Sequence, residues 1–350
     1  MYSYSNFTIN QPIAHHHLAV CSSTNSELMQ SVNTAKIDPS QPYMLTAGMQ
    51  TAGRGQRART WQSPIGNIYL SLYHPLQVPL SGLLSLVVGF HLTRLPIIQQ
   101  INRQRRAVGL PSIGVKWAND VGYYDVRPSS QPPIQPSDQF ITQSADQISP
   151  QSSRTQRSSF NKLAGILIEP VLTDNQITGV IVGVGINIEA APLLSETTKE
   201  GMDYQAISLT QIIEETQLTH NRQGDKNHIN TGLKNTAVAF PRADDLYRPV
   251  SATILRAINQ FMTFKQDPYS LTEFIKDYSA VNVLAGHQVQ ITQQSLITTK
   301  QVGADTAPQV FEPQILEGKV TGINADGSLQ LQSNNKVGMI NVYTGTIRVI

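Results

Sequence analysis

The chain has 350 residues, of which 40% are hydrophobic and 14% are charged, and its formal net charge is +2. This composition predicts a soluble globular protein with room for one large domain and one small one. The single cysteine, Cys21, excludes an internal disulfide and fits a reducing compartment.

Positive charge is concentrated in one part of the chain. Between Asp38 and Asp120 there are eight Arg and Lys residues and no Asp or Glu. A positive field confined to one region favours capture of a nucleotide-sized anion over coating of a long nucleic acid. We therefore expect no nucleic-acid partner.

Residues 1–21 are expected to be an N-terminal extension. They are too few for a folded DNA-binding module, and the first ten lack the basic and apolar regions of a signal peptide. The run His15-His16-His17 has no further ligand cluster beside it, so we interpret it as a solvated segment rather than a metal site. The most apolar segment, residues 83–98, is shorter than a membrane span. These features predict a cytoplasmic protein without a membrane partner.

The first motif is Ser23-Thr24-Asn25, followed by Glu27. One interpretation is a capping box, with Thr24 as N-cap and Glu27 three residues later, which opens a helix. The other is that the hydroxyl and amide groups of the motif bind a small neutral polar ligand. The two interpretations are compatible, because a helix start is a rigid platform.

Residues 47–73 contain Gly53-Arg54-Gly55, then Arg57, Arg59 and Trp61, ahead of an alternating strand at residues 68–73. Glycines allow close backbone approach to a ligand, and guanidinium groups bind phosphate or carboxylate oxygens. The glycine spacing also fits a dinucleotide fingerprint loosely, but no helix pattern and no acidic residue follow where that motif needs them. A surface turn with solvated arginines remains the simpler alternative.

A second polar group ends the apolar segment at residues 113–120, after a predicted helix at residues 80–95. It consists of Lys116, Asn119 and Asp120. These supply a cation for phosphate, an amide for hydrogen bonding and a carboxylate for Mg²⁺ or a proton. The alternative is a strand end with an Asx turn.

Residues 127–159 differ from the rest of the chain, because 21 of these 33 residues are Gln, Ser or Pro. Such a segment buries little apolar surface, so we predict a loosely ordered insertion without a catalytic role.

A hairpin of two apolar strands is predicted at residues 162–169 and 177–188, with the turn near residues 173–176. Lys162 stands at the head of the first strand, and the second strand contains Gly183, Gly185 and Asn187. Small residues at those positions allow a backbone or ligand to come close.

The last part of the chain predicts helices at residues 209–215, 251–264 and 271–278, with a polar loop at residues 216–248 between the first two. From residue 281 the pattern changes to short strands, with an Asp326-Gly327 hairpin signal and a polar loop near residues 296–310. This pattern is typical of a small β-barrel.

Five motifs in this order resemble those of a biotin protein ligase of the bacterial biotin–acetyl-CoA-carboxylase ligase type. They are Ser23-Thr24-Asn25, Gly53-Arg54-Gly55, Lys116-Trp117-Ala118-Asn119-Asp120, Lys162-Leu163-Ala164-Gly165-Ile166 and Gly183-Val184-Gly185-Ile186-Asn187. The resemblance extends from about residue 22 to residue 350, apart from the insertions.

The resemblance implies an α/β ligase domain at residues 22–280, with a mixed sheet, followed by an SH3-like barrel at residues 281–350. It implies that ATP and Mg²⁺ activate biotin to biotinyl-5′-AMP, and that biotin then passes to one lysine of the biotin carboxyl carrier protein of acetyl-CoA carboxylase. A homodimer is compatible with it, although no residue decides the oligomeric state.

The resemblance also implies roles for individual residues. The catalytic candidates are Lys116, Lys162, Arg54 and Asp120, with Asp120 also the candidate for Mg²⁺. Contacts to biotin or its adenylate are implied for Ser23, Thr24, Asn25, Gln50, Gly53, Arg54, Gly55, Gln56, Arg57, Trp61, Asn119, Lys162, Gly183, Gly185 and Asn187.

Two residues depart from the family pattern, which has Arg at the position of Gln56 and Pro at the position of Ala118. A neutral amide at Gln56 loses a charge-assisted contact, so we predict faster release of biotinyl-AMP than from a Gln56→Arg variant. The alternative is that Arg57 supplies the missing positive charge. A lipoate or octanoate ligase is the nearest alternative. A biotin-responsive repressor would need a DNA-binding domain that residues 1–21 are too short to supply.

Overall fold

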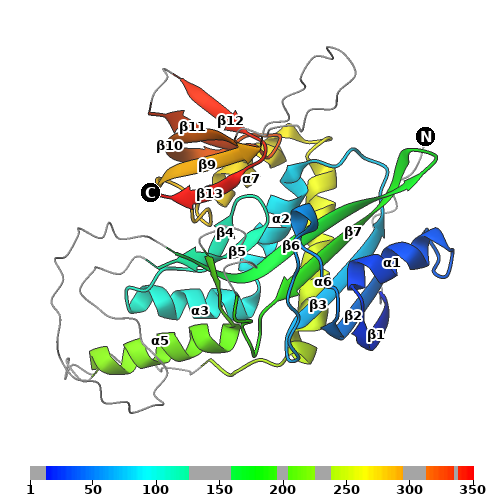
Figure 1. Ribbon diagram of the computed structural model, residues 1–350, viewed down its shortest axis with the longest axis horizontal. Helices are drawn as coiled ribbons and strands as arrows, with labels where there is room; N and C mark the ends of the chain where they lie inside the picture. The colour runs from blue at the N-terminus through cyan, green and yellow to red at the C-terminus, as the bar shows by residue number, and fades with distance from the viewer. Residues whose placement is uncertain (1–12, 126–158, 195–203, 225–237, 295–312, 335–337) are drawn as a thin grey trace, which may run out of the picture.

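The computed structural model describes residues 13–125, 159–194, 204–224, 238–294, 313–334 and 338–350. Its strands form two sheets, and the second is built from the C-terminal part of the chain (Figure 1). Within these residues no single helix is long and apolar enough to cross a membrane. The two helices Gly82–Thr93 and Pro96–Ala107, which meet at a bend, reach that length and apolar composition only when they are taken together.

The first sheet is mixed, as the resemblance implies. Its order is β1-β2-β3-β7-β6-β5-β4, with β8 paired to β6. The β1–β2 and β6–β8 pairs are parallel, and the remaining pairs are antiparallel. The strands are β1 (Ala14–Cys21), β2 (Tyr43–Gln50), β3 (Ile68–Pro75), β4 (Gly114–Lys116), β5 (Asp120–Tyr124), β6 (Phe160–Thr173), β7 (Gln176–Ile186) and β8 (Tyr204–Ala206).

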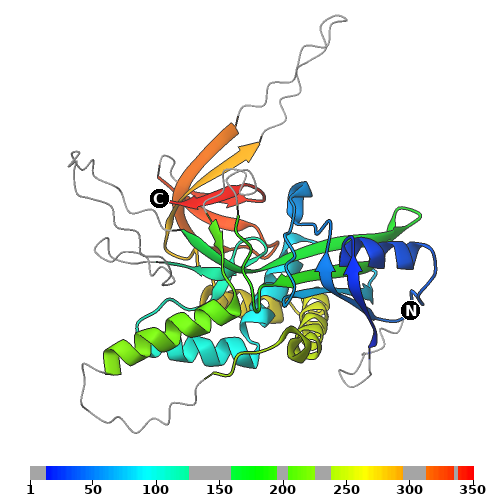
Figure 2. The ribbon, with the colours of Figure 1, turned by 60° about the horizontal axis from the view of Figure 1, so that its bottom comes forward.

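The two faces of this sheet pack against different helices. Ile68, Leu70 and Leu72 of β3 join the large core, whereas Tyr73 joins a smaller core with α1 (Thr24–Asn33). Successive side chains of a strand point to opposite faces, so this division assigns each face its own core. Figure 2 shows α1 on one side of the sheet and α6 on the other.

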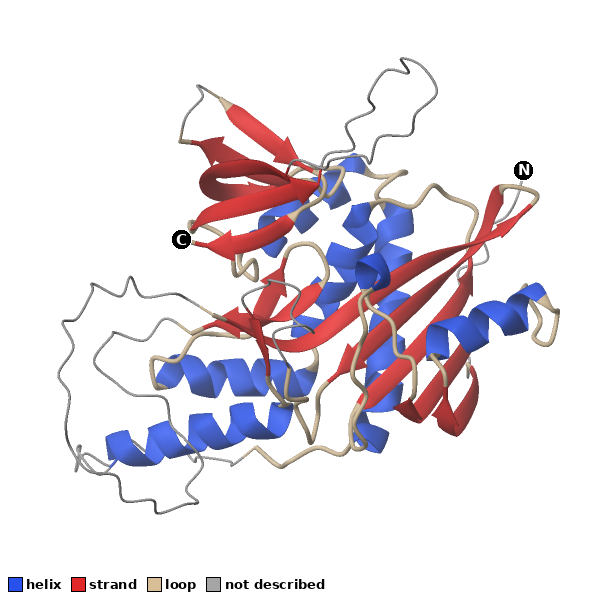
Figure 3. Cartoon of the chain, viewed as in Figure 1, coloured by secondary structure: helices blue, strands red, loops and turns tan. Residues whose placement is uncertain are grey.

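The large core is formed mainly by helices on the second face. They are α2 (Gly82–Thr93), α3 (Pro96–Ala107), α5 (Leu209–Gly224), α6 (Ala243–Thr263) and α7 (Pro268–Ser279). The central helix α2 packs against α6 and the sheet and is buried along most of its length (Figure 3). Because α1 covers only part of the first face, the rest of that face is available for a cavity.

The second sheet confirms the predicted small β region. Its order is β12-β11-β10-β9-β13, all antiparallel, and among the described residues no pairing of β12 with β13 closes it into a barrel. The strands are β9 (Gln288–Gln294), β10 (Pro313–Ile323), β11 (Leu329–Ser333), β12 (Met339–Val342) and β13 (Thr346–Val349).

The predicted Asp326-Gly327 turn connects β10 to β11 and also contacts the helix α2 and the turn between β4 and β5. Gly327 has φ +86°, and a Cβ there would lie 2.5 Å from the backbone nitrogen of Leu83 in α2. Its carbonyl accepts a hydrogen bond of 2.8 Å from Trp117 Nε1. A glycine is therefore needed for both the turn and the close approach.

The predicted extension is wrong for residues 14–21, which form the edge strand β1. His15 and His17 point to the same side, and each places a ring nitrogen within 2.9 Å of Thr46 Oγ1 on β2. The alternation of these side chains is that of a strand, while all three histidines are exposed, in agreement with a solvated segment.

The predicted loop at residues 216–248 is also wrong at both ends. The helix α5 continues to Gly224, and α6 begins at Ala243, with Pro249 inside it. Buried Leu246, Val250 and Ile254 keep helical spacing across the proline, so tertiary packing outweighs its local cost. Residues 225–237 lie outside the described residues, as do 126–158 of the predicted insertion and 296–310.

Candidate active site

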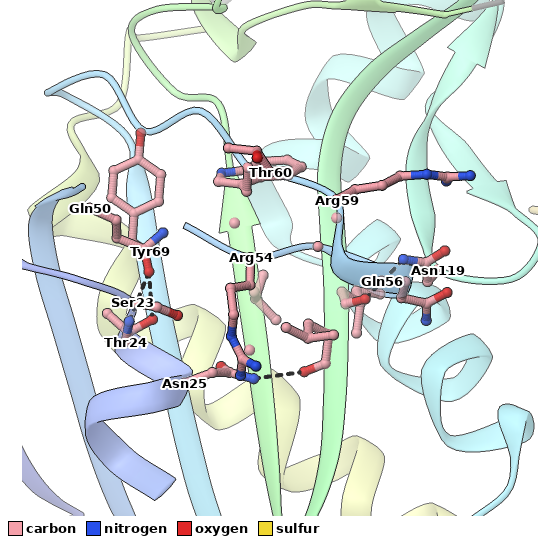
Figure 4. A pocket seen from close by; sticks show the side chains of 18 of the residues that line it. Ser23, Thr24, Asn25, Gln50, Arg54, Gln56, Arg59, Thr60, Tyr69 and Asn119 are labelled. Atoms are coloured by element: carbon pink, nitrogen blue, oxygen red, sulfur yellow. Dashed lines mark hydrogen bonds between the residues drawn. The ribbon is translucent and has the colours of Figure 1, made fainter. Parts of the chain in front are cut away.

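A cavity that is open to solvent lies on the α1 side of the first sheet. Its walls come from α1, the segment after β2, and strands β3, β5, β6 and β7 (Figure 4). The lining residues are Ser23, Thr24, Asn25, Gln50, Arg54, Gly55, Gln56, Arg59, Thr60, Trp61, Tyr69, Leu70, Asn119, Asp120, Lys162, Gly165, Ile166, Leu167, Gly183, Val184, Gly185 and Tyr204.

One end of the cavity is polar and formed mostly by uncharged groups, namely Ser23, Thr24, Asn25 and Gln50 (Figure 4). Gln50 Oε1 accepts from the Thr24 backbone nitrogen at 2.8 Å and from its hydroxyl at 3.2 Å. The buried hydroxyl of Ser71 donates to Asn25 Oδ1 at 2.5 Å and lies 2.8 Å from Thr24 Oγ1. These bonds fix the orientations of the motif side chains.

The capping-box interpretation of Thr24 is wrong. Ser23 is the N-cap of α1, with extended backbone and no side-chain cap bond, and Thr24 lies inside the first turn. Glu27 Oε1 instead accepts a hydrogen bond of 3.1 Å from Ser22 Oγ. The Thr24 hydroxyl bonds to Gln50 because the end of β2 lies beside the helix start.

The glycine-arginine segment forms a narrow hairpin over the cavity. Arg54 and Thr60 make an antiparallel bridge, and backbone bonds join Gly55 to Arg59 at 2.7 Å and Trp61 to Gly53 at 2.8 Å. Its tip is the short 3₁₀ turn η1 (Gln56–Ala58), not the long helix of a dinucleotide fold. A Cβ at Gly53 would overlap the carbonyl oxygen of Trp61, so this glycine permits the hairpin.

The indole of Trp61 lies over two glycines that are paired across β6 and β7. Gly165 and Gly185 are direct partners in the ladder, and a Cβ on them would lie 2.8 and 2.7 Å from Trp61 ring atoms. Trp61 Nε1 is buried, and within the described residues it has no hydrogen-bond partner. A ligand acceptor at this position would satisfy that donor.

The other end of the cavity is charged. Lys162 Nζ lies 2.8 Å from Asp120 Oδ1 and 5.3 Å from the ring centroids of both Trp61 and Tyr204. Asn119 lines the cavity here, and its Nδ2 donates to the carbonyl of Ile166 at 3.0 Å. Arg59 and Gln56 lie on the same side in Figure 4. This end suits anionic groups.

Arg54 lies between the two ends and is paired with an acidic residue that the sequence does not single out (Figure 4). Its Nη2 lies 2.7 and 2.5 Å from the two carboxylate oxygens of Glu169 on β6. The same carboxylate accepts a bond of 2.8 Å from Asn25 Nδ2.

Four of the candidate residues do not line the cavity. Lys116 is only 8% exposed, and its Nζ lies 4.6 Å from the centroid of the Phe160 ring. Asn187 is buried and donates to the carbonyl of Ile207 at 3.3 Å. Arg57 hydrogen-bonds the hydroxyl of Thr344, in the turn between β12 and β13, and burial lowers the pKa of Arg57. The fourth is Gly53, whose role in the hairpin is conformational.

Other lining or supporting residues were missed by sequence reasoning. Tyr69 lines the cavity, burial raises its pKa to about 12, and its hydroxyl donates to the carbonyl of Pro64 at 2.6 Å. Ser71 and Glu169 were missed too, although Ser71 shares a face of β3 with Tyr69, and Glu169 shares a face of β6 with Gly165. The signal that finds them is the period of two along β3 and β6.

The residues present do not form a metal site of their own. Within the described residues no group of three or more His, Cys, Asp and Glu side chains is placed to hold a metal ion. Asp120 is a single carboxylate, and it is paired with Lys162. Mg²⁺ is commonly held by one or two carboxylates together with substrate phosphates, and only that arrangement fits here.

Comparison with known proteins finds a family match for the segment that carries this cavity. Residues 18–187 match the family described as the Biotin/lipoate A/B protein ligase family. The matched segment is just under half of the chain. The matched segment includes every lining residue except Tyr204.

Similar proteins agree with the family match. The bifunctional ligase/repressor BirA of Salmonella typhimurium and that of Escherichia coli are each 27% identical over 187 residues, which is 53% of this chain and 43% of the relative. The match thus spans less than half of each relative. The biotin protein ligase from Aquifex aeolicus in complex with biotin and ATP is 18% identical, with a TM-score of 0.54 over 96% of this chain and 99% of that one. This likeness shows the fold.

Proposed function

We propose that the protein joins biotin to ATP, releasing pyrophosphate and holding biotinyl-5′-AMP, and then transfers biotin to a lysine of a biotin carboxyl carrier protein. The observation that carries this proposal is one cavity with two chemically different ends. A polar end with hydroxyl and amide groups faces a charged end around Lys162, and the Trp61 hairpin covers the space between them.

The polar end suits the ureido ring of biotin. That ring is flat, neutral and has both donors and an acceptor, so fixed hydroxyl and amide groups recognise it better than charges do. Thr24 and Asn25 are held by Gln50 and Ser71 before any ligand enters. Preorganised polar groups reduce the entropy that binding must overcome.

The charged end suits the first reaction step. A biotin carboxylate oxygen attacks the α-phosphorus of ATP, the new P–O bond forms, and the bond to pyrophosphate breaks. Two anions must approach each other, so a cation is required to offset their repulsion. Lys162 is the cation best placed for this, and Asp120 holds its ammonium group at 2.8 Å.

The second step needs a neutral amine. The carrier lysine must lose a proton before its nitrogen attacks the carbonyl of the mixed anhydride and displaces AMP. Asp120 lines the cavity on the charged side and is the carboxylate available to orient or accept that proton. Mg²⁺ would enter with the nucleotide and reduce the negative charge of its phosphates.

The relatives support the ligase activity, since both are named ligase/repressor, and the structural neighbour is a biotin protein ligase in complex with biotin and ATP. The family description also includes lipoate, so the acyl group must be tested directly.

The test is incubation with ATP, Mg²⁺ and labelled biotin, with and without a biotin carboxyl carrier domain. We expect label on the wild-type carrier and none on a carrier whose acceptor lysine is replaced by arginine. Parallel reactions with lipoate and octanoate should leave the carrier unmodified. Absence of labelled carrier together with transfer of lipoate would reassign the substrate.

A further inference from the structure

Glu169 is the only acidic side chain that the described structure places against Arg54 of the cavity. It lies on β6 on the same face as Gly165 and Leu167, next to the polar end. Its carboxylate binds the Arg54 guanidinium through both oxygens and accepts from Asn25 Nδ2. Glu169 is therefore the hydrogen-bond acceptor for two lining residues, Arg54 and Asn25.

The Asn25 amide is fixed from its other side as well. Its Oδ1 accepts from Ser71 Oγ at 2.5 Å, and a Cβ at Gly183 would overlap that oxygen. Asn25 cannot turn its amide over without losing both bonds, so its NH₂ group is directed at Glu169. The chain of contacts from Ser71 through Asn25 and Glu169 to Arg54 is continuous.

The electrostatic consequence concerns Arg54. Its side chain is 43% exposed and lines the cavity, whereas that of Glu169 is 23% exposed and does not. A guanidinium group facing a cavity binds carboxylate or phosphate oxygens through paired donors. With Glu169 already bound to its Nη2, the charge of Arg54 is balanced and the donors of that nitrogen face the carboxylate.

We propose that Glu169 is a specificity-determining residue, which neutralises Arg54 so that the polar end of the cavity accepts a neutral ring and rejects an anionic group. The ligand is then oriented with its ring beside Asn25 and its carboxylate beside Lys162. The inference rests on the proposed function, because the neutral ring is that of biotin.

The experiment uses a linear dicarboxylate, sebacate, as a competitor in a biotin-dependent pyrophosphate-release assay. Sebacate places a carboxylate at each end, so it fits only if the polar end tolerates an anion. The Glu169→Gln variant keeps the shape of the side chain and leaves Arg54 cationic. Sebacate inhibition should strengthen by up to about fivefold, the upper end of the range expected for a partly exposed ion pair. The KM for biotin should rise while the KM for ATP is retained.

Two charge variants separate this effect from general damage to the site. Arg54→Gln leaves Glu169 anionic, so sebacate inhibition should become weaker than in the wild type. Arg54→Gln combined with Glu169→Gln is again neutral and should return toward the wild-type inhibition constant. Glu273→Gln, at an exposed position on α7, makes the same change in total charge away from the cavity and should have no effect.

Equal sebacate inhibition of the wild type and Glu169→Gln would overturn the inference, and so would a double variant as sensitive as Glu169→Gln. A wild-type protein that releases no pyrophosphate with biotin would instead contradict the proposed function. Measuring the wild type first therefore distinguishes the two failures.

Discussion

Lys162 and Asp120 lie on adjacent strands, with Lys162 Nζ 2.8 Å from Asp120 Oδ1. The register of β5 with β6 shifts between Val121 and Gly122, so that Asp120 pairs with Gly165 while Gly122 pairs with Lys162. A bulge of this kind re-aims side chains next to functional sites. Here the bulge follows closely after Asp120, whose ion pair with Lys162 lines the cavity.

Replacing Lys162 tests the charge-offset step. Lys162→Gln removes the ammonium group but retains a polar chain, so we expect the rate of biotinyl-AMP formation to fall about 100-fold, as for loss of one preorganised donor. Single-turnover formation of the adenylate measures this rate. Lys319→Gln, at an exposed position in β10, is the matched control. A loss confined to the KM for biotin would contradict a role in chemistry.

Gly185→Ala tests the position of Trp61. The added methyl group would lie 2.7 Å from the indole, so the Trp61 hairpin must move away from the strands. We expect weaker binding of biotin, by about tenfold, with little change in the free energy of unfolding. Calorimetric titration with biotin and urea unfolding measure these quantities. Gly82→Ala, where a Cβ meets nothing within 4 Å, should leave biotin binding unchanged.

Gln56 provides a gain-of-function test. Gln56 lines the cavity near the charged end. Arg57 contacts Thr344 instead, so Arg57 does not supply the positive charge that the family has at the position of Gln56. Gln56→Arg should add a charge-assisted contact and slow release of biotinyl-AMP by about tenfold. A rapid-quench chase of the labelled adenylate measures release. Equal rates for the variant and the wild type would show that this position does not retain the intermediate.

A fourth prediction concerns stability away from the cavity. Arg105 is fully buried, and its Nη1 lies 2.9 Å from Glu215 Oε2, which also accepts from Tyr123 at 2.9 Å. Glu215→Gln leaves the buried guanidinium uncompensated, so we expect a loss of about 3 kcal/mol in the free energy of unfolding. Urea unfolding measures it. The exposed neighbour Glu214 offers the control Glu214→Gln, which should cost little.

Periodic segments were predictable because burial leaves a strong pattern in them. The strands β3, β6 and β7 and the helix α2 follow their expected positions, since each has an apolar face that the pattern records. The edge strand β1 was not predictable, because His15, His16 and His17 conceal the alternation. Its pairing with β2 depends on contacts far away in the sequence.

The site was predictable only where residues stand in recognisable motifs. Ser23, Gln50 and Lys162 line the cavity as expected, because the motifs lie at strand ends that the sheet brings together. Lys116 belongs to such a motif yet packs against Phe160 instead. Glu169 belongs to none of the five motifs, and its pairing with Arg54 depends on contacts far away in the sequence.

The most direct test of the central claim is pyrophosphate release by the wild-type protein with ATP, Mg²⁺ and one acid at a time. We predict release with biotin in the absence of any carrier, together with one equivalent of enzyme-bound biotinyl-AMP. We predict no release with lipoate or octanoate. Release that is independent of biotin, or that requires lipoate, would contradict the account.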